Sequence, residues 1–545
     1  MANKRKRDNA PESEPVEKTE QQSTKKVKAP APTKAARASS SSNTSAAPFK
    51  VDSTSPITIQ VVAGSYDRVL HGITASITPT TTTTSPSKNN KKKAAETKTS
   101  FKVSFADTFL FNAHASAIRC LALSPPSAPT PGQKKGGQKV LLATGATDER
   151  INIYNISAHP PSAKAADDQK LLNSITPRPV LENPKNRELG TLLHHSSNIT
   201  RLVFPNRSKL LSASEDSTVA VTRVRDWALL HTFKCPIPKA QGRPSGDTAA
   251  LGAVPAGVND FAVHPSNKIM ISVSKGERSM RLWNLETGKK SRVLNFPKEV
   301  LMEIGEGKHS TGEARRIVWG EDEFAVAFDR DVLVFGMDCR PRCRVMREDV
   351  VGTKMTKVHE IKYVSLGKAE GQEEGEEKHV LAVATEDGRI LFFDTAEESL
   401  IAPKEEAAKE EKEQQVKKHI IEAKTPNAKL VAQLGGKTAG VTGRIKDFVV
   451  LPIEDEETGK RSWFIASASS DGRVRMWRLE SDDLFVKGDA KAGRQVGELL
   501  GTYATDNRIT CLGAFVMIPR PEGSVESEYE FDSEESEDDD DSDDE

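Results

Sequence analysis

Hydrophobic and polar residues alternate along much of the chain in short paired runs separated by tight polar turns. The clearest pair is Ile465-Ala-Ser-Ala-Ser-Ser-Asp-Gly-Arg-Val-Arg-Met-Trp477, where two alternating segments flank a Ser-Asp-Gly turn. Alternation with a period of two places successive side chains on opposite faces of a strand, and such a turn joins antiparallel neighbours. The pattern therefore predicts a β-hairpin that ends on a tryptophan.

The same pattern recurs along the chain, each time with an acidic residue in the turn. The turn acids are Asp67, Asp148, Asp216, Glu277, Asp329, Asp387 and Asp471. The residues six positions later are Ile73, Tyr154, Thr222, Trp283, Phe335, Phe393 and Trp477. Five of these seven are aromatic in a chain that is only 5% aromatic, and a short carboxylate in a turn accepts hydrogen bonds from nearby backbone amides. The hairpin is therefore predicted to be the unit of a repeat protein.

This unit resembles the WD40 repeat, in which sets of four antiparallel strands assemble as a β-propeller. In that family a histidine before the inner strand bonds to the turn aspartate through a strand hydroxyl. The resemblance implies such a network in the second repeat, from His114, Thr144 and Asp148, with Tyr154 in the tryptophan position. The third repeat has His195, Ser212 and Asp216 but ends on Thr222, so its network is expected to be incomplete. The other repeats lack the histidine, and the positions that match the motif there are Trp283, Asp387, Asp471 and Trp477.

The two ends of the repeat array complement each other. Inner strands are expected at 117–122, 199–204, 258–263, 314–318, 358–364 and 444–451. The first hairpin, from Thr58, has no inner strand before it, and the last apolar segment, Arg508 to Phe515, has no hairpin after it. We predict that these ends pair in one sheet and close the ring, which removes exposed sheet edges. The predicted fold class is all-β, a seven-bladed WD40 β-propeller closed by its N- and C-terminal strands.

Within the WD40 group, one family is more similar than the rest. The chain combines the opening hairpin Val61-Val-Ala-Gly-Ser-Tyr-Asp67 with the segments Leu211–Asp216 and Phe261–Pro265, a basic N-terminus and an acidic tail. It is similar in this to the p21-activated-kinase-interacting-protein-like WD-repeat proteins, over about residues 55–520. The resemblance implies a non-catalytic nucleolar scaffold in assembly of the large (60S) ribosomal subunit, with pre-60S ribosomal proteins, assembly factors and precursor rRNA as partners. The alternatives are an adaptor that binds and restrains a p21-activated-type kinase, and a histone-binding propeller.

Composition divides the chain into a ring and two tails. Residues 1–50 are polar and basic and 520–545 are acidic, so both are predicted to be disordered because they cannot bury enough apolar surface to offset ordering entropy. The propeller is predicted at 51–519. Insertions are expected in connecting loops near 78–104, 125–138, 158–188, 236–257 and 396–427. The last one is rich in Glu, Lys and Ala and is expected to be either an exposed helix or a charged linker.

Charge is distributed unevenly, although the formal net charge is zero. Residues 522–545 hold fifteen acidic and no basic residues, which leaves 78 basic against 63 acidic residues elsewhere. A basic body is expected to meet polyanions, and RNA contact would run through phosphates. The candidate RNA contacts are Lys91, Lys92, Lys93, Lys134, Lys135, Arg340, Arg342 and Arg344. A solubilising surface is the alternative role for each of them.

The N-terminal basic residues form two clusters that resemble a two-part nuclear import signal. They are Lys4, Arg5, Lys6 and Arg7, followed by Lys25, Lys26 and Lys28. The N-terminus carries no apolar run of the kind found in a signal peptide, and no apolar stretch approaches the ~20 residues of a membrane span. The predicted location is the nucleus and nucleolus, with no membrane partner.

Catalytic and metal chemistry is not indicated. The turn acids belong to different repeats and are not expected to converge as a carboxylate pair, and no nucleophile-elbow pattern is present. The cysteines, of which Cys339 and Cys343 are the one close pair, form no zinc-like set with histidines and are expected to be reduced thiols. We therefore predict no enzyme, no cofactor, no metal and no small-molecule substrate.

Overall fold

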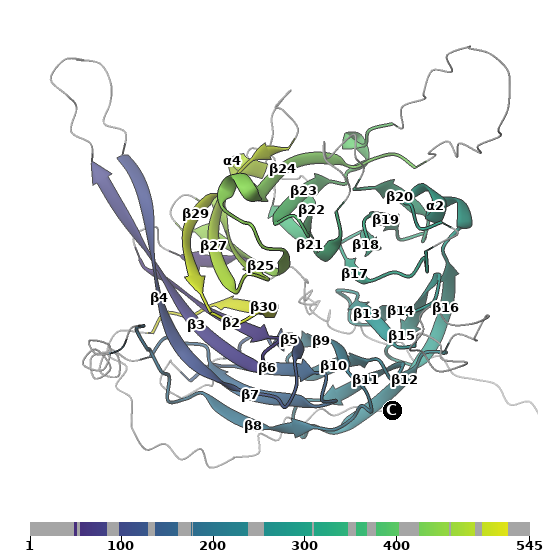
Figure 1. Ribbon diagram of the computed structural model, residues 1–545, viewed down its shortest axis with the longest axis horizontal. Coiled ribbons are helices and arrows are strands. Elements are labelled where there is room, and N and C mark those ends of the chain that lie inside the picture. The colour runs from purple at the N-terminus through teal and green to yellow at the C-terminus, as the bar shows by residue number, and fades with distance from the viewer. Residues whose placement is uncertain are drawn as a thin grey trace, which may run out of the picture. The chain divides into compact units, whose positions relative to one another are not determined.

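The predicted hairpins form the middle of seven separate β-sheets in a computed structural model of the protein (Figure 1). The structure describes residues 48–51, 55–83, 97–128, 137–161, 176, 178–237, 256–307, 310–346, 356–367, 378–402, 425–456, 459–484 and 493–520. All of them belong to one unit, Ser42–Glu545. We call each sheet a blade and number the blades by their turn acids.

Each blade begins with an innermost strand, and its other strands follow outward from the centre of the ring. Blade 1 contains β30 (Ile509–Val516), β2 (Ile57–Ser65), β3 (Val69–Thr83) and β4 (Thr97–Asn112). Blade 2 contains β5 (Ile118–Leu123), β6 (Lys139–Ala146), β7 (Ile151–Ser157) and β8 (Arg187–Leu192). Blade 3 contains β9 (Ile199–Asn206), β10 (Lys209–Ser214), β11 (Thr218–Arg223) and β12 (Leu229–Lys234). Blade 4 contains β13 (Val258–Val263), β14 (Ile269–Ser274), β15 (Ser279–Asn284) and β16 (Lys289–Asn295).

The remaining blades follow the same order, and two of them gain a fifth strand. Blade 5 contains β17 (Arg316–Trp319), β18 (Glu323–Ala327), β19 (Val332–Gly336) and β20 (Pro341–Arg344). Blade 6 contains β21 (Val358–Gly367), β22 (Lys378–Thr385), β23 (Arg389–Asp394), β24 (Lys429–Gly435) and β28 (Arg494–Gln495). Blade 7 contains β25 (Ile445–Asp455), β26 (Arg461–Ser469), β27 (Arg473–Glu480) and β29 (Glu498–Ala504), with β1 (Phe49–Val51) beside β25. The described helices are α2 (Lys298–Glu303), α4 (Ser481–Leu484), η1 (Glu397–Ser399) and η2 (Lys437–Ala439).

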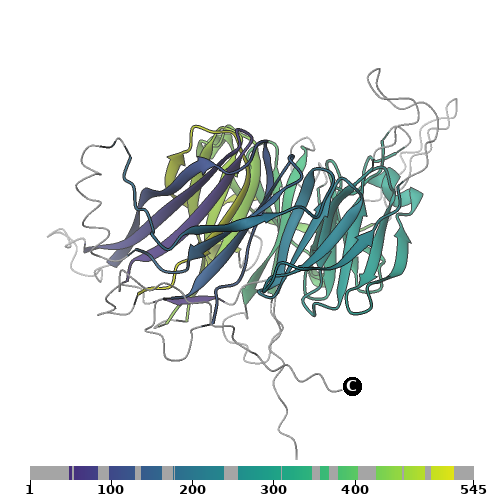
Figure 2. The ribbon, with the colours of Figure 1, turned by 90° about the horizontal axis from the view of Figure 1, so that it is seen from below.

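The inner strands close a ring. Each inner strand contacts the inner strand of the next blade, from β5 through β9, β13, β17, β21 and β25 to β30, and β30 contacts β5 again. In blade 1, Val61 pairs with Ala514 and Ala63 pairs with Leu512, so the N-terminal hairpin and the C-terminal strand share one sheet. The predicted seven-bladed propeller and its closure are confirmed. Figure 2 shows the blades from the side, with their strands running between the two faces of the ring.

The hydrophobic core lies between the blades. Seven groups of buried apolar side chains are present among the described residues, and each joins two neighbouring blades. One group, for example, packs Phe392 of blade 6 against Phe448 and Trp463 of blade 7. Burial of apolar surface contributes about 25 cal/mol per Å², so every blade depends on both neighbours for its stability.

Close packing between blades requires glycine at two matching positions. Gly64 is the second-last residue of β2 in blade 1, and Gly145 is the second-last residue of β6 in blade 2. A Cβ added to Gly145 would lie 2.6 Å from Cγ2 of Ile199 in blade 3, and one added to Gly64 would lie 2.8 Å from Cγ2 of Ile118 in blade 2. These glycines let adjacent sheets approach at the turn-bearing end.

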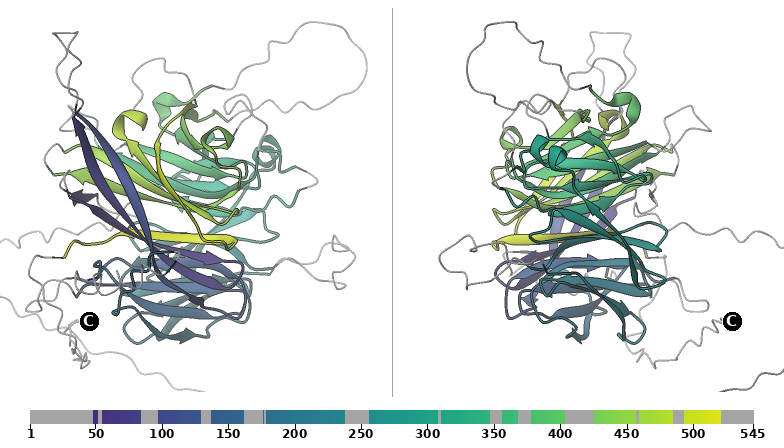
Figure 3. Two further views of the ribbon diagram at one scale, coloured as in Figure 1. Left: turned by 60° about the vertical axis from the view of Figure 1, so that its left-hand side comes forward. Right: turned by 90° about the vertical axis from the view of Figure 1, so that its right-hand side faces the viewer.

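Two features differ from the expected loops and tails, and a third expectation falls mostly outside the described residues. The interval 78–104 is strand at both ends, because β3 continues to Thr83 and pairs there with Thr97 at the start of β4 (Figure 3). Phe49 and Lys50, expected in the N-terminal tail, belong to β1, which pairs in parallel with β25. The helix or linker expected within 396–427 falls mostly on 403–424, outside the described residues.

Candidate functional site

A histidine bonds to the turn aspartate in blades 2 and 3. In blade 2, Nδ1 of His114 lies 3.1 Å from Oδ2 of Asp148, and Nε2 lies 2.9 Å from Oγ1 of Thr144. The backbone N–H of Ala115 also donates to Asp148, at 3.1 Å. Tyr154, the residue in the tryptophan position, is buried on β7. The histidine therefore ties the loop before β5 to the β6–β7 turn.

Blade 3 has the same arrangement around His195. Its Nδ1 lies 3.0 Å from Oδ2 of Asp216, and its Nε2 lies 2.8 Å from Oγ of Ser212. Burial alone would raise the pKa of Asp216, but hydrogen bonds from His195 and Thr218 outweigh it and lower the pKa to about 2. Burial lowers the pKa of His114 in blade 2, against the opposing effect of Asp148. These groups have the character of structural ties, since each is enclosed by its own blade.

Arginine takes the place of the histidine in three other blades. Arg475 donates to Asp471 at 2.9 Å and to Oγ of Ser469 at 2.6 Å, so it repeats the contact with the turn acid but uses a different strand hydroxyl. In blade 4, Arg281 lies 2.5 Å from Glu277. In blade 6, Nε of Arg389 lies 2.6 Å from Asp387. The signal in the sequence is an arginine two or four positions after the turn acid, which a pattern built on a preceding histidine does not detect.

Tryptophan side chains join the second and third strands of two blades. Nε1 of Trp283 donates to Oγ of Ser272 at 2.8 Å, and Nε1 of Trp477 donates to Oγ of Ser467 at 3.0 Å. Both rings are buried. A buried indole N–H needs such an acceptor, because an unsatisfied donor would cost about 1–3 kcal/mol.

Charged side chains on the inner strands link neighbouring blades and, in one ion pair, blades 3 and 6. Arg201 of β9 lies 3.3 Å from Asp260 of β13 and 3.3 Å from Glu360 of β21. Arg316 of β17 also lies 3.3 Å from Glu360, which is almost fully buried. Burial would raise the pKa of Glu360, but the two guanidinium groups dominate and lower it. This cluster neutralises itself and braces the inside of the ring.

Two inner-strand aspartates also fasten one blade to the next. Oδ2 of Asp260 accepts from the backbone N–H of Ile317 at 3.1 Å, and Oδ2 of Asp447 accepts from the backbone N–H of Leu512 at 2.9 Å. Because Leu512 belongs to the closing strand β30, Asp447 helps to hold the ring shut.

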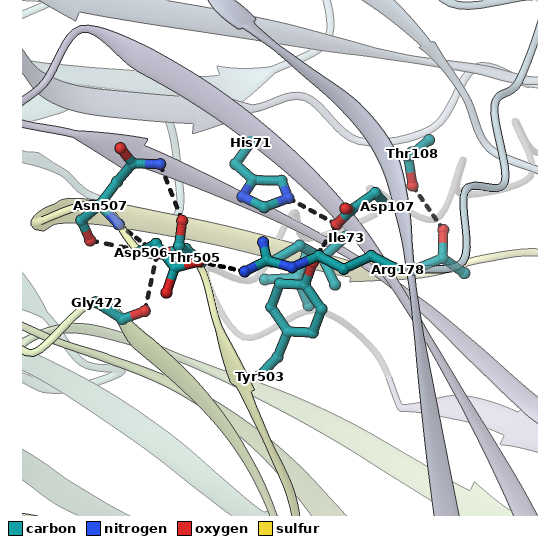
Figure 4. Close-up of polar contacts among 12 residues, drawn as sticks. His71, Ile73, Asp107, Thr108, Arg178, Gly472, Tyr503, Thr505, Asp506 and Asn507 are labelled. Carbon is teal, nitrogen blue, oxygen red and sulfur yellow. Dashed lines mark hydrogen bonds and ion pairs between the residues drawn. The ribbon is translucent and has the colours of Figure 1, made fainter. Parts of the chain in front are cut away.

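The outer seam between blades 7 and 1 carries a further polar network (Figure 4). Asp107 of β4 lies 2.7 Å from Nε2 of His71 and accepts from the hydroxyl of Tyr503 on β29. Arg178 pairs with Asp506 and lies over the ring of Tyr503, with its guanidinium carbon 5.7 Å from the ring centroid. The segment around Arg178 therefore crosses the edge of β4, where the backbone N–H of Asp107 donates to the carbonyl of Pro179 at 2.8 Å.

The basic residues singled out as RNA contacts are not brought together on a described surface. Lys91, Lys92, Lys93, Lys134 and Lys135 lie outside the described residues. Arg340 is exposed, and Arg342 lies 3.2 Å from Glu323 and 2.8 Å from Glu397. Arg344 is buried against Asp331, so its assignment as an exposed RNA contact is wrong, because the ion pair keeps the guanidinium in the protein interior.

The import clusters also lie outside the described residues. They comprise Lys4, Arg5, Lys6, Arg7, Lys25, Lys26 and Lys28. Across the described ranges, no group of three or more His, Cys, Asp or Glu side chains is arranged to hold a metal ion. None of the described helices has the length and apolar character that a bilayer crossing requires.

Comparisons with known proteins agree with this architecture. The WD domain, G-beta repeat model matches residues 186–221, which comprise β8 of blade 2 and most of the first three strands of blade 3. The repeat in the sequence therefore begins with the outer strand of one blade and continues with the first three strands of the next. The same offset leaves β30 at the end of the array to complete blade 1. Protein MAK11 of Saccharomyces cerevisiae is 26% identical over 70% of this chain and 71% of its own length. A p21-activated protein kinase-interacting protein 1-like protein of Xenopus laevis is 22% identical over 76% of each chain.

The human p21-activated protein kinase-interacting protein 1 is 22% identical over 47% of this chain and 45% of its own length. The repeat match, the seven closed blades and the turn-acid networks lead to the same assignment. The chain is a seven-bladed WD40-repeat β-propeller with low but extended similarity to MAK11 and the p21-activated protein kinase-interacting protein 1-like proteins.

Proposed function

We propose that this protein is a non-catalytic scaffold in assembly of the large ribosomal subunit and acts in the nucleolus. The observation that carries the proposal is the extent of the similarity to MAK11, which covers 70% of this chain and 71% of that protein. The family resemblance found in the sequence implies the pre-ribosomal setting, and the basic N-terminal clusters support nuclear import.

The ring supports a role in holding partners. Interblade cores, buried ion pairs and strand closure make the blades mutually dependent, so loops on either face are presented from a fixed frame. A rigid frame lowers the conformational entropy that is lost when a partner is bound. Under this proposal the protein holds precursor rRNA and pre-60S proteins in place and leaves when the subunit matures.

Purification of the tagged full-length protein, with RNA sequencing and mass spectrometry, tests the proposal. Large-subunit rRNA precursors and pre-60S proteins are the expected partners, and the protein should sediment with pre-60S particles and move to lighter fractions after RNase treatment. A protein that stays out of the nucleolus and sediments free of pre-ribosomes contradicts the proposal.

A second candidate is an adaptor for a p21-activated-type protein kinase. The names of the relatives from Xenopus laevis and human favour it, since both describe a kinase-interacting protein. In the same purification, recovery of a kinase without rRNA precursors supports the adaptor and rejects the assembly role. Recovery of histones alone supports the chromatin alternative.

A further inference from the structure

The turns and the beginnings of the inner strands lie on the same face of the ring. In each blade the start of the inner strand pairs with the end of the second strand, as Ile118 does with Ala146 and Ile445 with Ser469. The second strand then leads directly into the turn with the acidic residue. We call this side of the ring the turn face.

Cationic side chains gather where the inner strands begin on the turn face. Arg444 and Arg508 directly precede β25 and β30, Lys357 directly precedes β21, and Arg119 and Lys446 are the second residues of β5 and β25. We call these five residues the basic rim. Because β21, β25, β30 and β5 are consecutive around the ring, the rim follows a continuous arc.

The charge of the basic rim is only partly neutralised by the described residues. Arg119, Lys446 and Arg508 form no ion pair with any described carboxylate. Arg444 lies 3.0 Å from Glu386, but Lys357, Arg315 and Arg330 share the single carboxylate of Asp329. The arc therefore carries excess positive charge.

Burial and the closeness of these cations lower the pKa of two partly buried side chains, Lys446 and His359. Burial and the charges of Arg444 and Arg508 lower the pKa of Lys446. Burial is the main cause that lowers the pKa of His359 on β21 to about 4, and the positive charges of Lys446 and Arg444 lower it further. This imidazole is therefore neutral near pH 7. A bound anion would relieve the repulsion among these groups.

An exposed aromatic ring lies within the basic rim, beside Arg508. Tyr66 is 59% exposed, and the guanidinium carbon of Arg508 lies 5.5 Å from its ring centroid. Beside it is a depression of about 480 Å³ lined by Tyr66, Asp67, Arg68, Ser116, Ala117 and Thr147. The hydroxyl oxygen of Ser116 is buried there and has no hydrogen-bond partner among the described residues.

We propose that the basic rim and Tyr66 form a binding site for single-stranded RNA on the turn face. The cations follow the phosphate backbone, Tyr66 stacks on a base, and Ser116 is placed to bond a sugar or base edge in the depression. Proteins bind single strands with this combination of a positive groove and aromatic platforms. An acidic peptide matches the charge but offers no base for Tyr66, which is why RNA is favoured. The inference rests on the proposed function, which supplies precursor rRNA as the ligand.

Binding of a short fluorescent single-stranded RNA to the full-length protein, followed by anisotropy over a range of salt concentrations, tests the site. The double variant Lys446→Ala/Arg508→Ala should reduce the slope of log affinity against log salt by about 1.4, because each phosphate contact on a single strand contributes about 0.7. Tyr66→Ala should weaken binding by about 5-fold to 150-fold with the salt slope unchanged, and Tyr66→Phe should keep the affinity.

The matched control is Lys289→Ala/Lys290→Ala, which removes the same charge from exposed positions on β16. It should leave the affinity within about twofold, since it removes no phosphate contact. Equal losses in the control and rim variants overturn the site. The proposal is also overturned if a polyglutamate peptide binds as tightly as RNA and its affinity is unchanged by Tyr66→Ala. That result would make the basic rim a site for acidic peptides.

Sedimentation separates this inference from the proposed function. If the wild-type protein sediments with pre-60S particles while the rim variants bind RNA normally, the rim site fails and the assembly role stands. If the wild-type protein binds RNA through the rim but sediments free of pre-ribosomes, the rim site stands and the assembly role fails.

Discussion

A turn carboxylate is held by a cationic or imidazole partner in several blades, but the partner comes from different places in the sequence. His114 and His195 reach it from the loop before the inner strand, whereas Arg281 and Arg475 reach it from the third strand of the same hairpin. Either partner satisfies buried oxygen atoms that would otherwise destabilise the turn. Several blades of this chain thus stabilise the turn carboxylate in the same way, although the residue that contacts it is histidine in some blades and arginine in others.

We expect Asp216→Asn to destabilise the protein by about 1–2 kcal/mol at neutral pH, because the depressed pKa of Asp216 favours the folded state. This stabilisation is present above the unfolded pKa near 3.8 and is lost as pH falls toward about 2. Urea midpoints measured from pH 7 downward should therefore converge for the variant and the wild type in acid.

Asp226→Asn serves as the control for Asp216→Asn. Asp226 pairs with Arg223 at 2.6 Å, but both side chains are in solvent, so screening weakens the pair. Its urea midpoint should stay close to that of the wild type at every pH. An equal shift in the two variants would contradict a specific role for the buried His195–Asp216 pair.

At the scale of elements, sheets fit together because small residues stand where strands of adjacent blades meet. Gly145 faces Ile199 of the next blade, and its backbone lies too close for a larger side chain. The hairpins and inner strands predicted from the alternating pattern correspond closely to strands of the structure. The inner strand predicted at 258–263, for instance, is β13, Val258–Val263.

We expect Gly145→Ala to destabilise the protein by about 1–3 kcal/mol, because the added methyl group overpacks the contact with Ile199. The matched change Gly307→Ala adds the same methyl group where no atom lies within 4 Å, and it should be nearly neutral. Thermal and urea unfolding of the two variants makes the comparison. If Gly145→Ala and Gly307→Ala are equally stable, blades 2 and 3 can move apart slightly without loss of folding free energy.

Elements without a strong pattern could not be predicted from the sequence. The stretch from Thr78 to Thr83 lacks alternation and so favours a loop, yet threonine is β-branched and suits the extended hairpin that the structure contains. The short strands β1 and β28 pair in parallel with remote strands, and nothing local to them indicates such a partner. The basic rim has no sequence signal for a related reason, since its members are single residues that only the ring brings together.

At the scale of the whole molecule, the ring depends on one non-local sheet. β2 and β3 come from the N-terminal end and β30 from the C-terminal end, and the apolar group that joins blades 7 and 1 contains residues from both. The closure was predictable because each chain end had an incomplete set of strands. The two described ends also meet, since Phe49, Lys50, Pro519 and Arg520 line one depression of about 360 Å³.

We expect a circular permutant to fold when residue 520 is linked to residue 48 and new ends are opened within 403–424. Its blades keep all their strands, so its urea midpoint should remain close to that of the wild type. A chain that ends at residue 507 loses β30, and it should elute as aggregates and unfold without a cooperative transition. Cooperative unfolding of the shortened chain would contradict closure as a source of stability.

Pairing of β2 with β30 also sets an order of events during synthesis. The ribosome makes β2 before the inner strands of blades 2 to 7 and β30 after them, so one edge of β2 has no partner until those six blades have been made. The nascent chain must therefore carry an open, apolar strand while blades 2 to 7 are synthesised. A chaperone, or rapid folding of the intervening blades, must protect that edge from aggregation during synthesis.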